Sequence, residues 1–420
     1  MSRTRRILLI VSTLVFLCGA GLAWRANAGL SRGLDYLQKQ KFFHARREFD
    51  WYLKLHPNDA DALFAMAEAI VKDKASRTAE EAARQSIAFL DQIPTDSEIG
   101  AKARLQSGRL RILILRQPTA AEADLKEAVR RDPDLFDAQY MLWKILDLTR
   151  RYYLVEPYFR RCFALATPSQ KPFLLREWYF SQCSTFIAAS QFDQAMGFVK
   201  EGEPSDALTE YKRLISFANE EPDPALNHAE LASWSEEYHF PEEQWKHFEA
   251  TWERVDSSTP PEVFGILFDL LMEAGRLDEA RQVFESWPEP HEGFDYQKRA
   301  TIYHVELEPD LDLAITANRE AIKEWPGPVD WQLHHRLAGL LVQAKKTEEA
   351  DKVRTEAKRL ELLMEIKLHT ELREGIMGPP SVESARRMAE FYRDINRPIE
   401  ADGWDEIGDQ LAQRSEDSTQ

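Results

Sequence analysis

Apolar side chains recur every three or four positions along most of this chain, from residue 29 onward. In the first such stretch, Ala45 is followed four positions later by Phe49, so both side chains lie on one face of a helix. The small residue lets two helices approach closely, and the aromatic ring fills the space beside them. No long alternation of Val, Ile or Thr occurs, so the pattern predicts helix nearly throughout.

The predicted helices are interrupted at a regular interval. Prolines recur at spacings of 37, 39 and 35 residues, and alanines further along recur at spacings of 34 and 36 residues. A period of about 34 residues is typical of a helix–turn–helix unit that buries its apolar face only by stacking on a neighbour. The sequence therefore predicts an all-α solenoid, a row of stacked helix pairs. The residues that set the spacings are Pro57, Pro94, Pro133 and Pro168, and then Ala280, Ala314 and Ala350.

The first unit has the residue types of a known repeat. Gly33 and Tyr36 fall in its first helix, Ala45 and Phe49 in its second, and Pro57 closes it. These residues resemble the tetratricopeptide repeat family, which has the same residue types at these intervals. The resemblance implies a right-handed superhelical solenoid with a concave surface that binds protein. Later units share the packing positions Gly108, Ala121, Ala128, Pro133, Ala280, Phe284, Ala314, Ala321, Pro326, Ala350 and Ala357.

The repeats are predicted to form two groups on either side of a less regular stretch. Residues 29–170 and 260–412 fit the repeat pattern best. Prolines cut residues 171–259 into shorter helices, which we interpret as degenerate repeats. Residues 413–420 contain no apolar side chain, so we expect a disordered tail.

Residues 1–28 have the composition of a leader that directs export. Three arginines among the first six residues precede an uncharged apolar run over residues 7–24. As a helix, this run is just long enough to span a bilayer. Because arginines stay on the cytoplasmic side, we expect the body of the protein on the exported, periplasmic or extracytoplasmic side.

Two fates of the leader remain open. Trp24 and Arg25 resemble an interfacial anchor, which favours retention as a single N-terminal membrane helix. The sequence Ala26-Asn27-Ala28 fits the small-residue cleavage pattern, and cleavage after Ala28 would release the body as a secreted protein.

The net charge and its distribution limit the classes of partner that the chain is expected to bind. The net charge of −17 and the pI of about 5.2 argue against nucleic-acid binding, which needs a basic surface. Residues 102–161 carry 13 Lys/Arg and 8 Asp/Glu, whereas residues 201–330 carry 10 and 31. This asymmetry reflects either solvated helix faces or a surface that selects a basic partner.

No set of residues points to catalysis, a cofactor or a metal. The chain lacks a phosphate-binding glycine loop, a His-Glu-x-x-His motif, a Cys-x-x-Cys pair and a Gly-x-Ser-x-Gly elbow. Cys162 and Cys183 sit among large apolar residues, which favours buried thiols over a disulfide. Trp245, Phe248 and Trp252 lie on one helical face, either as core or as an exposed partner patch.

The sequence thus favours a non-catalytic scaffold that binds a protein or peptide partner on the exported side of a membrane. The alternative is an accessory subunit of an envelope-assembly or enzyme complex, and an enzyme is least favoured. Some tetratricopeptide repeat proteins hold the carboxylate end of a peptide with lysines and asparagines on successive first helices. The well-matched units here have no asparagine in their first helices, so this mode is not expected.

Overall fold

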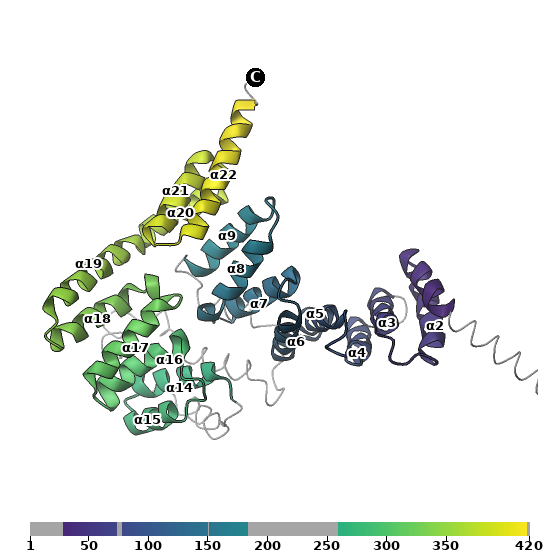
Figure 1. The fold of residues 1–420 in the computed structure, drawn as a ribbon, viewed down its shortest axis with the longest axis horizontal. Coiled ribbons are helices and arrows are strands. Elements are labelled where there is room, and N and C mark those ends of the chain that lie inside the picture. The colour runs from purple at the N-terminus through teal and green to yellow at the C-terminus, as the bar shows by residue number, and fades with distance from the viewer. Residues whose placement is uncertain (1–27, 74–77, 150, 184–258, 418–420) are drawn as a thin grey trace, which may run out of the picture. The chain divides into compact units, whose positions relative to one another are not determined.

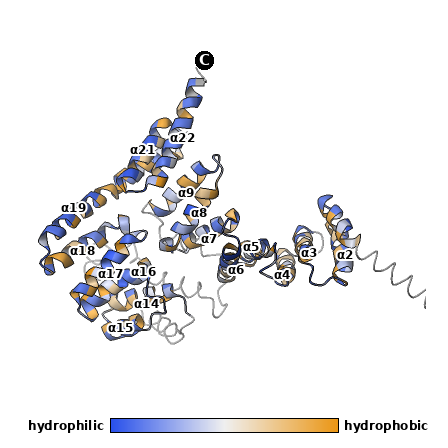
Figure 2. Cartoon of the chain, viewed as in Figure 1, coloured by the Kyte–Doolittle hydropathy of each residue, from blue (hydrophilic) through white to orange (hydrophobic). Residues whose placement is uncertain are grey.

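The described part of the chain folds into helices. The computed structural model describes residues 28–73, 78–149, 151–183 and 259–417, and every regular element in these ranges is a helix (Figure 1). Hydrophilic and hydrophobic residues both occur along most helices, as expected where one face is buried (Figure 2). The all-α prediction is therefore confirmed.

Two compact units make up the chain, Met1–Leu142 and Trp143–Gln420. Their boundary lies inside a helix, α7 (Phe136–Leu148), and inside the block 29–170 that the repeat pattern groups together. In the first unit, residues 28–38 are helical and are followed by α2 (Phe42–Leu53), α3 (Ala60–Lys72), α4 (Ala79–Leu90), α5 (Gly100–Leu110), the π-helical turn η1 (Arg111–Leu115) and α6 (Pro118–Arg131).

The second unit contains the remaining helices, and neighbours along the chain pack as pairs. Its first part comprises η2 (Tyr152–Leu154), α8 (Glu156–Leu165) and α9 (Lys171–Gln182). Its later part comprises α14 (Pro261–Glu273), α15 (Leu277–Glu285), α16 (Gly293–Ile302), the π-helical turn η3 (Tyr303–Leu307), α17 (Leu311–Lys323), η4 (Gly327–Val329), α18 (Trp331–Gln343), α19 (Thr347–Leu363), α20 (Ile366–Met377), α21 (Val382–Asp394) and α22 (Pro398–Asp417).

The prolines of the sequence period mark the ends of alternate helices. Each lies two to four residues beyond a helix, because proline has no N–H to continue the backbone ladder. The four pairs are Pro57 after α2, Pro94 after α4, Pro133 after α6 and Pro168 after α8.

Five turns between paired helices share one backbone conformation. The residue two positions before the second helix has a φ between 56° and 70°, and a buried alanine is the fourth residue of that helix. At four of these turns the next backbone N–H bonds the carbonyl five residues earlier in the first helix, as from Lys346 to Leu341 at 2.9 Å, which closes that helix in a Schellman motif. After η1, Gln117 instead bonds the carbonyl of Arg111, six residues earlier, at 2.9 Å. The pairs are Gln40 with Ala45, Arg116 with Ala121, Gly275 with Ala280, Lys345 with Ala350, and Asn396 with Ala401.

One expectation for the ends of the chain is wrong, and another concerns residues outside the described part of the chain. Helix α22 continues to Asp417, so the disordered tail expected from residue 413 is wrong for residues 413–417. These polar residues extend the helix that Trp404 anchors in the core. Among the described residues no helix is both long and apolar enough to cross a membrane, and the predicted span at residues 7–24 lies outside them.

Candidate functional site

The site begins with a contact between helices that are far apart in sequence. Within the second unit, α9 packs against α22 (Figure 1). The buried guanidinium of Arg397, just before α22, lies over the rings of Trp178 at 5.2 Å and Trp325 at 4.6 Å. It also pairs with Glu400, at 2.9 Å from Nε, and with Glu156. Cation–π contact and ion pairing therefore hold three parts of the chain together.

Further contacts fix the orientation of α9. Tyr179 Oη lies 3.0 Å from Nδ1 of His369 on α20, and Lys171 Nζ lies 3.0 Å from Oε2 of Glu406 on α22. A Cβ at Gly403 would lie 2.9 Å from Cδ1 of Leu175, so this glycine lets α22 approach α9 closely. The helices around the site are thus held by contacts on several sides.

Cys162 and Cys183 support this region as packing groups. Cys162 and Cys183 are buried, and no disulfide joins them. Cys183 Sγ lies 3.9 Å from Oη of Tyr392 on α21. Burial raises the pKa of the Cys183 thiol to about 12, so the thiol stays protonated and inert at neutral pH.

A buried carboxyl lies beneath α9. Asp147 accepts a hydrogen bond from Nε2 of Gln182 at 2.8 Å, and Gln182 accepts one from Nε1 of Trp325 at the same distance. Burial raises the pKa of Asp147 to about 7, although Lys144, with Nζ 3.6 Å from Oδ2, opposes the shift. The carboxyl lies within the support of the site and does not line the groove described next.

These helices enclose an apolar groove of about 300 Å³, which we call the α9/α22 groove. Its walls come from the start of α9, the end of α20, the start of α21 and the middle of α22. Its volume is at the lower end for ligand sites and fits one or two large side chains. The lining residues are Ser169, Pro172, Phe173, Arg176, Gly375, Ile376, Pro380, Ser381, Ser384, Ala385, Trp404, Ile407 and Leu411.

The groove exposes an aromatic ring over a packed floor. Phe173 is 45% exposed, whereas Trp404 is only 6% exposed and anchors α22 beneath it. A Cβ at Gly375 would lie 3.2 Å from Oγ of Ser384, so the end of α20 crosses close to the first turn of α21. This fixed apolar surface is suited to binding apolar side chains rather than to chemistry on a substrate.

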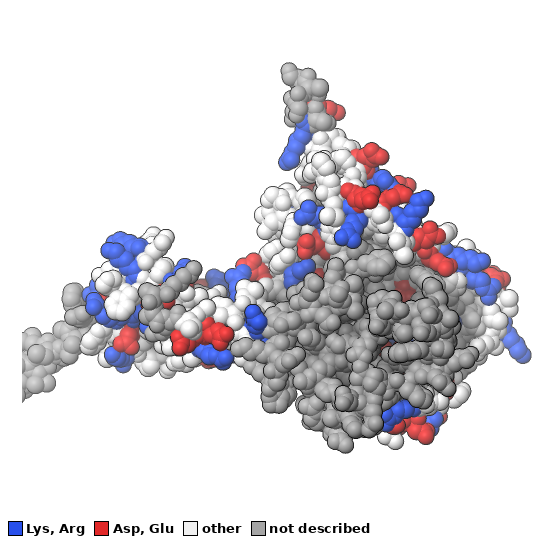
Figure 3. Space-filling view, turned by 180° about the vertical axis from the view of Figure 1, so that it is seen from behind, with Lys and Arg blue, Asp and Glu red and all other residues white. Residues whose placement is uncertain are grey.

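Among the described residues that line the groove, Arg176 is the only charged one, and it is exposed. Over the C-terminal helices, basic and acidic side chains are interspersed (Figure 3). Many of those around the groove are paired with one another: Lys171 with Glu406, Arg386 with Asp405 and Arg387 with Glu371. The groove therefore presents an apolar lining with one cation.

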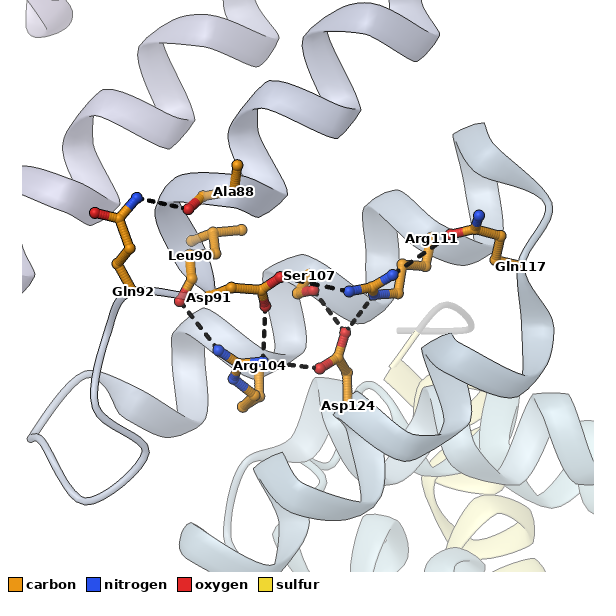
Figure 4. A network of polar contacts seen from close by, with 9 residues as sticks. All are labelled: Ala88, Leu90, Asp91, Gln92, Arg104, Ser107, Arg111, Gln117 and Asp124. Atoms are coloured by element: carbon orange, nitrogen blue, oxygen red, sulfur yellow. Dashed lines mark hydrogen bonds and ion pairs between the residues drawn. The ribbon is translucent and has the colours of Figure 1, made fainter.

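The first unit contains a different polar cluster, shown in Figure 4. Arg104 Nη1 lies 2.9 Å from Asp91 and 3.1 Å from Asp124, and Arg111 Nε lies 2.8 Å from Asp124. Ser107 donates a hydrogen bond of 2.6 Å to the same carboxylate. Two cations face two anions, so the cluster is neutral and joins α4, α5, η1 and α6 as a packing element. Part of the basic excess over residues 102–161 is thereby neutralised within the fold.

The residues singled out from the sequence fall into two classes. Most packing positions are buried, whereas the turn residues Pro57 and Pro133 are exposed and Tyr36 and Pro326 are half-buried. The aromatic patch Trp245, Phe248 and Trp252 lies outside the described residues. The buried positions are Gly33, Ala45, Phe49, Gly108, Ala121, Ala128, Ala280, Phe284, Ala314, Ala321, Ala350 and Ala357.

None of the groove residues was singled out from the sequence, because the groove joins helices more than 190 residues apart. The one available signal was Pro172-Phe173 at the start of a helix with an arginine one turn later. Within the described residues, no group of three or more His, Cys, Asp or Glu side chains is placed to hold a metal.

Comparison with known proteins identifies repeats in one segment of the chain. Residues 30–96 match the model of the tetratricopeptide repeat family, so the resemblance drawn from the first unit is confirmed for this segment. A solved structure described as the human IFIT1 dimer with PPP-AAAA is similar at 14% identity and a TM-score of 0.29, with 90% of this chain and 81% of that chain covered. No curated protein sequence matches the chain.

Proposed function

We propose that this protein is a non-catalytic scaffold that binds a protein partner, and that the α9/α22 groove receives one or two apolar side chains of that partner. The observation that carries the proposal is the groove itself, an apolar surface lined from α9, α20, α21 and α22. A preformed site of this kind binds without paying for reorganisation of the protein. Tetratricopeptide repeats in residues 30–96 support an interaction role for the chain as a whole.

The groove is supported from beneath in a way that suits a docking site. Arg397, Trp178 and Trp325 hold α9 against α22, and none of these three side chains lines the groove. Phe173, in contrast, is exposed on the groove wall. An exposed aromatic group on a rigid support is typical of residues that dominate binding energy at interfaces.

The proposed scaffold is exported. Residues 7–24 would anchor it in a membrane with the body on the exported side, or cleavage after Ala28 would release it. The stacked pairs after this leader would wind as a right-handed superhelix. The partner is then expected among exported or membrane-bound proteins.

Selection from a random peptide library displayed on phage tests the docking site. The full-length chain is the target, and the selected peptides are measured against two variants. Phe173→Asp places a charge in the groove, whereas Leu313→Asp makes the same change at an exposed leucine on α17 that does not line it. We expect Phe173→Asp to weaken binding by about tenfold or more and Leu313→Asp to leave it unchanged.

The proposal fails if no peptide is enriched, or if the selected peptides bind wild type and Phe173→Asp equally. Circular dichroism of both variants shows whether each is folded, because both positions are solvent-exposed and tolerate a polar group. Equal loss in both variants would also place the binding surface elsewhere.

Protease added to intact cells that express the full-length chain tests the export proposal. Digestion of the body without lysis supports export, and protection until lysis contradicts it. Mass spectrometry of the N-terminus separates the two fates, because cleavage after Ala28 leaves Gly29 as the first residue.

A further inference from the structure

We infer that the ligand of the α9/α22 groove is a peptide segment in which a carboxylate lies next to large apolar side chains, and that Arg176 binds this carboxylate. The inference rests on the proposed function, because it specifies the ligand of the same site. Two features support it: Arg176 is the charged residue among the described lining of the groove, and its guanidinium lies beside the apolar lining residues.

Arg176 is available to a ligand. It makes no ion pair or hydrogen bond with any other described residue, whereas Arg386, Arg387 and Arg393 in the same region all pair with acidic side chains. A guanidinium presents a planar set of donors that matches a carboxylate in a two-point contact. Arg176 is exposed, so solvent screens part of that contact, and the apolar lining on one side of it strengthens it relative to an ion pair on an open surface.

The start of α21 adds donors on a second wall. Ser381 caps this helix by accepting a hydrogen bond from the N–H of Ser384 at 3.1 Å, and its own hydroxyl donates to Oγ of Ser384 at 2.8 Å. The hydroxyl of Ser384 can then donate its own proton to an acceptor in the groove. The N-terminal end of α21 carries a partial positive charge, but the exposed carboxylate of Glu383 in its first turn offsets it in part, so Arg176 supplies the main attraction for an anion.

The geometry of α9 sets the spacing within the ligand. Phe173 and Arg176 are three residues apart on one helical face, which separates the apolar contact from the cation by about 5 Å along the axis. An extended peptide covers this distance in about two residues, and a helical peptide in one turn. The carboxylate is therefore expected within one to four residues of the apolar side chain.

A peptide fits these features better than a nucleic acid does. Nucleic-acid binding requires several cations along a phosphate backbone, and the described lining of the groove supplies one. The net charge of −17 repels acidic ligands at long range, so capture of a carboxylate depends on the local cation. A basic peptide would instead place its charge beside Arg176.

Synthetic peptides test the inference. Each carries a Leu-Phe pair followed at one to four positions by Glu, Gln or Lys, with an amidated end, and a second series places the free chain terminus there instead. Binding to the full-length protein is measured by fluorescence polarisation. We expect Glu to bind about tenfold more tightly than Gln, and Lys most weakly. The two series show whether a side-chain or a terminal carboxylate is bound.

Two charge reversals complete the test. Arg176→Glu is expected to abolish the preference for Glu and to favour Lys. Lys367→Glu makes the same change in net charge on α20 at an exposed lysine that does not line the groove, and it should leave the preference intact.

The outcomes separate this inference from the proposed function. Apolar peptides that bind through Phe173 with no preference for Glu, or with equal changes in both charge variants, overturn the inference and leave the docking site standing. If no peptide binds, or if every peptide binds wild type and Phe173→Asp equally, the docking site itself is overturned. A preference for Glu that Arg176→Glu reverses supports both.

Discussion

Gly33 faces the ring of Phe49 so closely that a Cβ at position 33 would lie 2.3 Å from Cε1 of that ring. Phe49 is completely buried, and its ring therefore occupies the space that a side chain at position 33 would need. Gly108 has the same relation to Leu125, whose Cγ would lie 2.9 Å from an added Cβ. In both of these helix pairs, a glycine on the first helix leaves room for a large side chain on the second helix.

Gly33→Ala is expected to destabilise the first unit by about 1–3 kcal/mol, because the added methyl group displaces a buried ring. Gly339→Ala is the matched control, since nothing lies within 4 Å of its added Cβ and it sits in a helix. There alanine should stabilise by about 0.5–1 kcal/mol. Urea unfolding followed by circular dichroism measures both. A neutral Gly33→Ala would contradict the close packing.

The turns with a positive φ predict opposite effects at two equivalent positions. Gly275 has a φ of 70° and an open environment, so Gly275→Ala should cost about 1 kcal/mol through backbone strain alone. Lys345 has a φ of 59° at the equivalent place, so Lys345→Gly should stabilise by about 0.5–1 kcal/mol. Thermal denaturation of the two variants provides the comparison. The same sign of change in both would argue against the shared turn.

Asn318 occupies the position that Leu125 fills in α6, four residues after the buried alanine. It is fully buried, and neither Oδ1 nor Nδ2 has a hydrogen-bond partner in the described structure. Asn318→Ala should therefore stabilise the protein by about 1 kcal/mol, because it removes two unsatisfied polar groups. Leu125→Ala should destabilise it by about 2–5 kcal/mol. A calorimetric melting curve in which both variants lose stability would show that the Asn318 amide is satisfied.

Asp147 makes the stability of the second unit depend on pH. Burial raises its folded-state pKa from 3.8 to about 7, so between about pH 4 and 7 the folded protein binds a proton that the unfolded chain releases. This group's contribution is fully present below pH 4 and is lost as the pH rises through 7. Asp147→Asn keeps the acceptor for Gln182 and should match wild type at pH 4 but exceed it by on the order of 3 kcal/mol at pH 8.

Urea unfolding at several pH values between 4 and 8 measures that difference. Glu177→Gln is the control, because its partly exposed carboxyl also lies near Lys144 but is not buried. Parallel pH profiles for wild type and Asp147→Asn would exclude a proton bound by Asp147 in the folded state.

The repeat itself could be predicted from the sequence because it rests on local signals. Pro57 and its equivalents stop helices wherever they occur, and Ala45 with Phe49 marks a buried face four residues apart. The turn conformation could be predicted only in part. Gly275 and Asn396 are typical of a positive φ, whereas Gln40, Arg116 and Lys345 are not, because the surrounding helices impose the conformation on them.

The π-helical turns explain another gap between sequence and structure. Each of η1 and η3 inserts residues that break the 3.6-residue period, and each exposes its central apolar side chain, Leu113 or Val305. In a regular helix, the 3.6-residue period alone would have predicted which of these side chains are buried. The groove was unpredictable for a different reason, since Phe173 and Trp404 come together only through contacts across 231 residues of chain.

The cluster around Arg397 has a consequence for the order in which the newly made chain matures. Trp178 is synthesised 219 residues before the guanidinium that covers it. At ordinary translation speeds this gap lasts about 10–45 seconds. The helices of the first unit pack mainly with their neighbours along the chain, whereas α8 and α9 must wait for nearly the whole polypeptide. Until then the aromatic side chains around Trp178 stay uncovered, and we expect a chaperone to protect them.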